Sequence, residues 1–279
     1  MAKLNRISNR VWSIVMTIVC VLWMYPIFMV LMNSLKSPNA ISTSTAFQLP
    51  LGDDFAGFVN YDNAINTQGF FSSLFYSVVI TVTSVFAILI FCSMFAWYIT
   101  RVNTRITKLL YGLCAFSMVV PFQMVMFTMS KLANILHLDN PVGIIFVYLG
   151  FGAGLSTFTF TGFARYVPME IEEAACIDGC GPVRMFFSVV FPVLKPTAIT
   201  VAILNAMWIW NDYLLPYLLL GSRYKTIPIA VQYLKGGYGS VDMGAMMAML
   251  VLAILPIVVF YLACQKHIIK GVIAGAVKG

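Results

Sequence analysis

Long runs of apolar residues alternate with shorter polar segments along the whole chain of 279 residues. A helix that crosses a lipid bilayer needs about 20 predominantly apolar residues. Six runs reach roughly this length without a lysine or arginine: residues 12–32, 71–99, 109–129, 142–161, 197–220 and 244–264. The pattern predicts an all-α, polytopic membrane protein with six transmembrane helices, in which residues 1–279 form a single membrane domain.

The composition agrees with this interpretation. The sequence is 61% hydrophobic and 10% charged, whereas soluble domains carry about 25% charged residues. The formal net charge of +7 is more typical of a membrane protein with basic cytoplasmic ends than of a nucleic-acid-binding protein, so we expect contact with lipid and no nucleic acid. The first apolar run is too long for a signal peptide and lacks a small-residue cleavage site, so we expect it to be retained.

The distribution of basic residues predicts the orientation of the chain. If the N-terminus is cytoplasmic, 12 of the 17 lysines and arginines lie on the cytoplasmic side and five lie outside. Basic residues favour the cytoplasmic side of a membrane. We therefore expect both termini, and the long mixed loop 162–196, to be cytoplasmic in a multi-pass plasma-membrane protein.

The loop 162–196 holds four of the ten acidic residues of the chain within nine positions: Glu170, Glu172, Glu173 and Asp178. Pro168 suits the first turn of a helix, acids in that turn favour the positive end of the helix dipole, and glycine suits the C-terminal cap. We therefore expect a helix over 168–178 that stops at Gly179.

One face of this helix and a second short helix complete the expectation for the loop. Ile171, Ala174, Ala175 and Asp178 fall on one helical face, and the two alanines allow another surface to approach closely. A second short helix is expected over 182–191, before Pro192. An amphipathic connector that lies on the membrane surface is an equally good interpretation of the periodicity alone.

The sequence of this loop resembles that of a known protein family. E-A-A-C-I-D-G at 173–179, followed by V-V-F-P at 189–192, is similar to the E-A-A loop of binding-protein-dependent ABC importer permeases. Val189 and Phe191 replace the usual isoleucine and leucine. The matching residues are Glu173, Ala174, Ala175, Asp178, Gly179 and Pro192. The resemblance implies the type I ABC importer permease fold, with this loop as the coupling helix that docks in a cleft of an ATPase subunit.

Other segments are similar to the carbohydrate branch of that family, most of all to the maltose-type G subunit: P-F-Q at 121–123, W-N-D-Y at 210–213, T-I-P-I-A at 226–230 and the C-terminal segment. The resemblance implies import of a di- or oligosaccharide, or of a related polyol or glycerophosphate, by alternating access. It also implies a larger F-type permease partner, two ATPase subunits and an external sugar-binding protein. The chain lacks G-x-x-x-x-G-K-[ST], so ATP and Mg are expected on the partner ATPase and no cofactor on this chain.

Asp212 is the one charged residue inside a predicted span. A charge in a bilayer is costly and usually functional or paired. Asn205, Trp208 and Asp212 share a helical face, and Asn211 adds another amide; such sets suit sugars, whose hydroxyls need polar partners and whose C–H faces pack on aromatic rings. These four residues are the expected substrate pathway. The open alternative is that Asp212 lies at the outer interface or caps a kink before Pro216.

No catalytic set and no metal site are expected. The spans contain no pair of carboxylates, and the C-x3-C pair Cys176 and Cys180 has no second pair and no nearby histidine. A glycine-rich tip at 236–239 in the last outside loop could reach a binding protein or be a passive connector. The alternative function is a self-contained secondary transporter, which normally shows internal repeats and several intramembrane charges.

Overall fold

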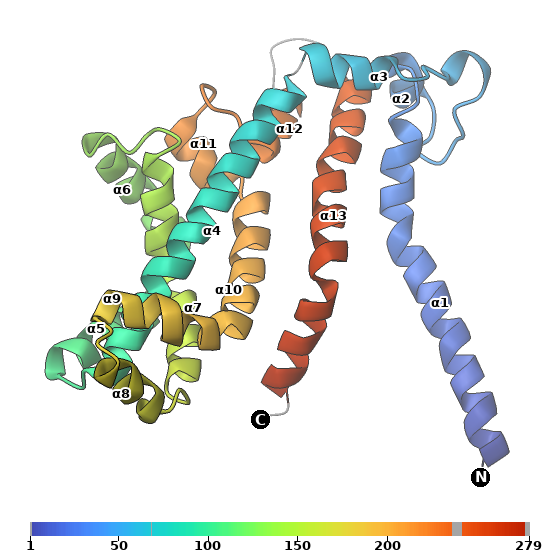
Figure 1. Cartoon of the computed structure of the whole chain (residues 1–279). Helices are drawn as coiled ribbons and strands as arrows, with labels where there is room; N and C mark the ends of the chain where they lie inside the picture. Colours follow the sequence, from blue (N-terminus) through green and yellow to red (C-terminus); the bar gives the residue numbers. More distant parts are fainter. Residues whose placement is uncertain (1, 68, 236–241, 277–279) are drawn as a thin grey trace. The chain divides into compact units, whose positions relative to one another are not determined.

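The computed structural model describes residues 2–67, 69–235 and 242–276 (Figure 1). The chain divides into two compact units. Unit 1 comprises residues 1–71 and 230–258, and unit 2 comprises residues 72–229 and 259–279. The expected glycine-rich tip at 236–239 lies outside the described residues.

The described residues form helices and turns, with one isolated β-bridge between Lys36 and Phe55. In chain order the elements are α1 Ala2–Asn33, α2 Pro38–Thr43, the 3₁₀ turn η1 Gly52–Asp54, α3 Val59–Asp62, the π-type turn η2 Asn63–Thr67, α4 Phe70–Arg101, α5 Arg105–Ser117, α6 Phe122–Ile135, α7 Gly143–Ala164, α8 Met169–Ile177, α9 Pro182–Met185, the π-type turn η3 Phe186–Val190, α10 Phe191–Asn211, α11 Leu214–Leu220, α12 Ile227–Lys235 and α13 Met243–Ala276.

Within the described ranges, five helical segments are long and apolar enough to cross a membrane: Val11–Asn33, Phe70–Arg101, Gly143–Ala164, Pro182–Asn211 and Met243–Lys266. A sixth span is possible if α5 and α6 count as one segment, which is bent by 110°. The predicted all-α, polytopic membrane fold is confirmed.

The third apolar run, predicted as one span over 109–129, is broken into two helices. α5 ends at Ser117, and α6 begins after Pro121, whose backbone is extended (φ −63°, ψ 136°). Proline has no amide hydrogen to donate, and it disfavours a helical conformation in the residue before it. The run therefore forms two short helices that meet at a sharp bend.

The fifth run also differs from the prediction. The helix starts at Pro182, well before residue 197, and ends at Asn211, well before residue 220. Pro192 does not end a short helix over 182–191, because the preceding turn η3 is π-type: the Phe191 amide bonds the Phe186 carbonyl, five residues back. This wider turn accommodates a proline, and π-bulges commonly occur inside longer helices.

In unit 2, α7 packs closely against its neighbours. A Cβ atom added at Gly154 would lie 2.6 Å from the Ser117 hydroxyl oxygen and 2.8 Å from the Cys114 carbonyl oxygen of α5. One added at Gly152 would lie 2.6 Å from Ile88 of α4 and 3.0 Å from Asn205 of α10. Small residues allow helices in a membrane to approach in this way. Helix α7 is therefore the centre of the unit that carries the candidate site.

Unit 1 contains a folded connector after α1. The buried Lys36 donates from Nζ to the Thr45 carbonyl at 2.9 Å, and the buried Asn60 donates to the carbonyls of Ser34 and Lys36 at 2.8 and 2.7 Å. Gly244, at the start of α13, lies directly against the Asn60 side chain. These bonds satisfy polar groups that would otherwise be buried alone.

Candidate functional site

Helix α8 begins and ends within one residue of the range 168–178 that the sequence predicts. Pro168 is its N-cap residue, and Gly179 follows its C-terminus with a left-handed backbone (φ +78°). The amide of Gly179 donates to the Cys176 carbonyl at 3.0 Å, and that of Cys180 donates to the Ala175 carbonyl at 2.9 Å. This pair of bonds is the Schellman motif, which requires a left-handed residue and therefore favours glycine. Asp178 is the C-cap residue.

The predicted common face of Ile171, Ala174, Ala175 and Asp178 is divided in the structure. Ala175 is 7% exposed and packs against its own chain, whereas the other three are exposed. Four of the exposed residues share one side of the helix: Glu170, Glu173, Ala174 and Ile177, which we call the exposed face of α8. Ile177 is 87% exposed. An isoleucine with this exposure at the end of a helix is available for contact with another surface.

Glu172 holds α8 in place. Its carboxylate accepts hydrogen bonds from Arg101 Nε (3.0 Å) and Nη2 (2.7 Å) through Oε1, and from Trp97 Nε1 (3.1 Å) through Oε2. Arg101 Nη2 also donates to the carbonyl of Val167 at 2.7 Å, just before α8. Glu172 is 7% exposed. These bonds tie α8 to the last turn of α4, and we call them the Glu172 anchor.

Aromatic packing continues the anchor toward η3. The Trp97 ring lies 5.7 Å from the ring of the fully buried Phe186. Figure 1 shows α8, α9 and α5 gathered at the same end of unit 2, with α6 and α11 at its other end. The helix that the sequence singles out is therefore fixed to both α4 and the start of the long helical segment that contains α10.

The four predicted pathway residues do not form one cluster. Asn205, which is 3% exposed, donates to Ser156 Oγ at 3.1 Å and to the Val201 carbonyl at 2.9 Å. Asn211 is exposed and donates to the Met207 carbonyl at 2.7 Å. Asn205 thus joins α10 to α7, whereas Asn211 bonds its own helix.

Asp212 lies at the break between α10 and α11. Its Oδ1 accepts the amides of Leu214 (3.0 Å) and Leu215 (3.4 Å), and its Oδ2 accepts the hydroxyl of Tyr148 (3.1 Å). The same tyrosine ring meets Trp208 edge to face at 5.5 Å, and Trp208 is 40% exposed. Asp212 therefore caps α11 and, through Tyr148 of α7, shares a neighbour with Trp208.

Sequence patterns do not single out Glu172 or Tyr148 among the acids and aromatic residues around them. Their partners, Arg101 and Asp212, lie 71 and 64 positions away in the chain. In the parts of the chain that the structure describes, no three His, Cys, Asp or Glu side chains come together as a metal-binding group.

Residues 89–274 match the family of the binding-protein-dependent transport system inner membrane component. The match includes α8, the Glu172 anchor and the Asp212 break. The chain belongs to this family. Members are transport permeases and not enzymes, and the predicted relation to ABC importer permeases is confirmed.

The similarity between this permease and its relatives extends over nearly its whole length. It is 36% identical to a probable starch degradation products transport system permease protein, AmyC, of Thermoanaerobacterium thermosulfurigenes, with 94% of each chain covered. It is 33% identical to the multiple sugar-binding transport system permease protein MsmG of Streptococcus mutans (97% of this chain, 98% of the other). It is 30% identical to the melibiose/raffinose/stachyose import permease protein MelC of Bacillus subtilis, with 98% of each covered.

The fold also matches a solved structure. A chain from the crystal structure of a bacterial ABC transporter that imports the acidic polysaccharide alginate aligns with a TM-score of 0.78, at 24% identity, over 94% of this permease and 96% of that chain. The two chains share the fold.

The Glu172 anchor predicts a loss of stability when its charge is removed. Glu172→Gln keeps the size and one acceptor but leaves the Arg101 guanidinium without its counter-charge. The cost should fall below the about 3–5 kcal/mol of breaking a fully buried ion pair, because the Arg101 side chain is 17% exposed. We expect a lower melting temperature of the purified protein and faster proteolysis of the α8 segment. Glu170→Gln, on the exposed face of the same helix, is the matched control. Equal stability of the two variants would contradict the anchor.

The Asp212 cap predicts a different result for two substitutions. Asparagine is a good helix cap and keeps an acceptor for the α11 amides, whereas alanine removes it at a cost of about 0.5–2 kcal/mol. Asp212→Ala should therefore lower the melting temperature, and Asp212→Asn should leave it close to that of the wild type. If both variants lose the same stability, capping is not the role of this carboxylate.

Proposed function

We propose that this permease is the sugar-translocating membrane subunit of an ATP-driven, binding-protein-dependent importer, and that its substrate is a di- or oligosaccharide. The observation that carries the proposal is the near full-length similarity to permeases whose names refer to starch degradation products, multiple sugars, and melibiose, raffinose and stachyose.

The working assembly pairs this chain with a second, F-type permease, two ATPase subunits that bind ATP and Mg, and an external sugar-binding protein. Both termini and α8 lie on the cytoplasmic side of the plasma membrane of a bacterial-type cell, in agreement with the 12-to-5 distribution of basic residues. Outside the cell, the binding protein delivers the sugar to the permease pair.

Coupling in this assembly takes place at α8. The exposed face of α8, with Glu173, Ala174 and Ile177, docks into a cleft of the ATPase, and Gly179 sets where the helix stops. The exposure of Ile177 supports this role, since burying an isoleucine contributes about 1.5–3 kcal/mol. Asp178 and the buried Ala175 shape the end of the helix. ATP favours the closed ATPase pair, and this preference shifts the permeases from inward- to outward-facing.

The sugar pathway runs past the Asp212 break. Trp208 offers a half-exposed ring for stacking on a sugar face, and the exposed Asn211 offers an amide. Asp212 shares Tyr148 of α7 with Trp208, and Asn205 ties α10 to α7 through Ser156. Capping and transport are compatible roles here, because Asp212 keeps the helix break at which the two exposed groups stand.

The proposal is tested in proteoliposomes that contain the complex purified with its ATPase. Uptake of labelled maltotriose and raffinose should require both ATP and the binding protein. Ile177→Asp and Gly179→Val should each lower uptake and stimulated ATPase activity about tenfold. The first loses an apolar contact, and the second places a branched side chain at φ +78°.

Gly162→Ala is the control for these variants, because a Cβ at this position of α7 meets nothing within 4 Å. Normal uptake by both α8 variants would contradict coupling through α8. Uptake driven by an ion gradient without the ATPase would contradict the importer and favour a secondary transporter.

A further inference from the structure

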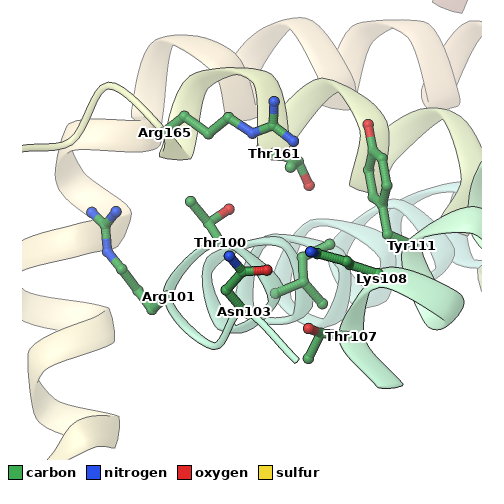
Figure 2. A pocket seen from close by; sticks show the side chains of 9 residues that line it. Thr100, Arg101, Asn103, Thr107, Lys108, Tyr111, Thr161 and Arg165 are labelled. Atoms are coloured by element: carbon green, nitrogen blue, oxygen red, sulfur yellow. The ribbon is translucent and has the colours of Figure 1, made fainter. Parts of the chain in front are cut away.

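A cavity of about 430 Å³ lies at the α8 end of unit 2. Its walls come from the end of α4, the first turns of α5 and the end of α7 (Figure 2). This cavity is separate from the exposed face of α8 and from the residues of the proposed sugar pathway. Ligand sites in proteins commonly have volumes of about 300–1,000 Å³.

The charge of the lining is entirely positive. Arg101, Lys108 and Arg165 line the cavity, and no acidic side chain does. Arg101 is already bonded to Glu172 and Val167. Lys108 and Arg165 have no ion-pair partner among the described residues. Two basic side chains therefore face one space without a counter-charge.

The carbonyl groups at the helix ends around the cavity do not explain why Lys108 and Arg165 are there. In α7, the carbonyls of Thr161 and Ala164 accept the amides of Arg165 and Val167. After α4, the Val102 carbonyl accepts the Thr107 hydroxyl at 2.6 Å. These carbonyls have donors in the chain itself, so the two basic side chains are not required as their caps.

A buried hydroxyl adds an independent sign of a ligand. Thr161 lines the cavity, is 3% exposed, and its Oγ1 has no hydrogen-bond partner in the described structure. A buried polar group without a partner costs about 1–3 kcal/mol. Figure 2 shows the Arg165 guanidinium and the Lys108 ammonium reaching toward this space from α7 and α5, with Thr161 between them and Tyr111 beside it.

We propose that this cavity binds a phosphate group, with Lys108 and Arg165 pairing with its charge and Thr161 donating a hydrogen bond. Arginine and lysine are the usual protein partners of phosphate, and charge-assisted bonds of this kind are about twice as strong as neutral ones. The cavity lies at the ends of apolar helices, where the headgroup of an anionic phospholipid would reach it. A soluble phosphate compound supplies the same chemistry. The proposal is independent of the identity of the transported sugar.

The test measures how fast an amine-reactive reagent modifies Lys108 in the purified complex, in nanodiscs of phosphatidylcholine. Adding phosphatidylglycerol to the nanodiscs, or inorganic phosphate to the buffer, should slow this modification about tenfold, the change expected for strong ionic hydrogen bonds. Slowing by phosphatidylglycerol alone identifies a lipid headgroup. Slowing by inorganic phosphate identifies a soluble ligand.

Matched variants make the result specific. Arg165→Gln and Thr161→Val should each reduce the protection of Lys108, whereas Arg105→Gln, one helical turn from Lys108 and outside the cavity, should not. Lys131 of α6, at the other end of unit 2, reports general surface effects in the same samples and should not be protected. The melting temperature of each variant shows whether it is folded.

Three results would overturn the proposal. The first is a Lys108 modification rate that neither additive changes. The second is protection that persists unchanged in Arg165→Gln. The third is protection that depends only on the presence of the ATPase subunits, because Lys108 would then be covered by a protein contact.

Discussion

A carboxylate buried against the end of a membrane helix is stable only when cationic and hydrogen-bonding groups surround it. Glu172 meets this condition through Arg101 and Trp97, both in the final turns of α4. Because Arg101 also bonds the Val167 carbonyl, one guanidinium fixes both the entry to α8 and its first turn. The helix that is proposed to meet the ATPase therefore cannot move far without pulling on a transmembrane helix. This constraint ties α8 to α4.

A similar requirement, that polar groups among apolar helices find partners within the protein, applies to the break between α10 and α11. Non-helical backbone at membrane depth is tolerated where other protein groups satisfy it. At the α10–α11 break, Asp212 accepts two amides of α11 and the Tyr148 hydroxyl. The break is thus stabilised and can present Trp208 and Asn211 without exposing bare backbone to lipid. Helix α7, which supplies Tyr148, Ser156 and Thr161, connects this break to the opposite end of unit 2.

Much of the fold could be predicted because lipid imposes long apolar runs, and the ends of α8 could be predicted because Pro168 and Gly179 act locally. The effects of two prolines were less predictable. Pro121 bends the run 109–129, whereas Pro192, which was expected to follow a short helix over 182–191, does not interrupt the helical segment Pro182–Asn211, because η3 accommodates it. Proline marks a place where a helix is weakened, and the surrounding packing decides the outcome.

The candidate site was predictable only in part. The E-A-A motif identifies Glu173, but the buried contact belongs to its neighbour Glu172, whose partner Arg101 is 71 positions away. A one-residue difference on a helix changes the face by about 100°, so a motif alone does not tell which of two adjacent glutamates points inward. Long-range pairs such as Tyr148 with Asp212 need the packed structure.

The central claim is that the Glu172 anchor presents the exposed face of α8 to the ATPase. Its most direct test is cross-linking in the assembled complex, with Ile177→Cys as the single cysteine of this chain and a cysteine in the ATPase cleft. The account predicts an efficient cross-link with Glu172 in place and a clearly weaker one when Glu172→Gln is added. No cross-link from position 177, or the same yield in both backgrounds, would contradict it.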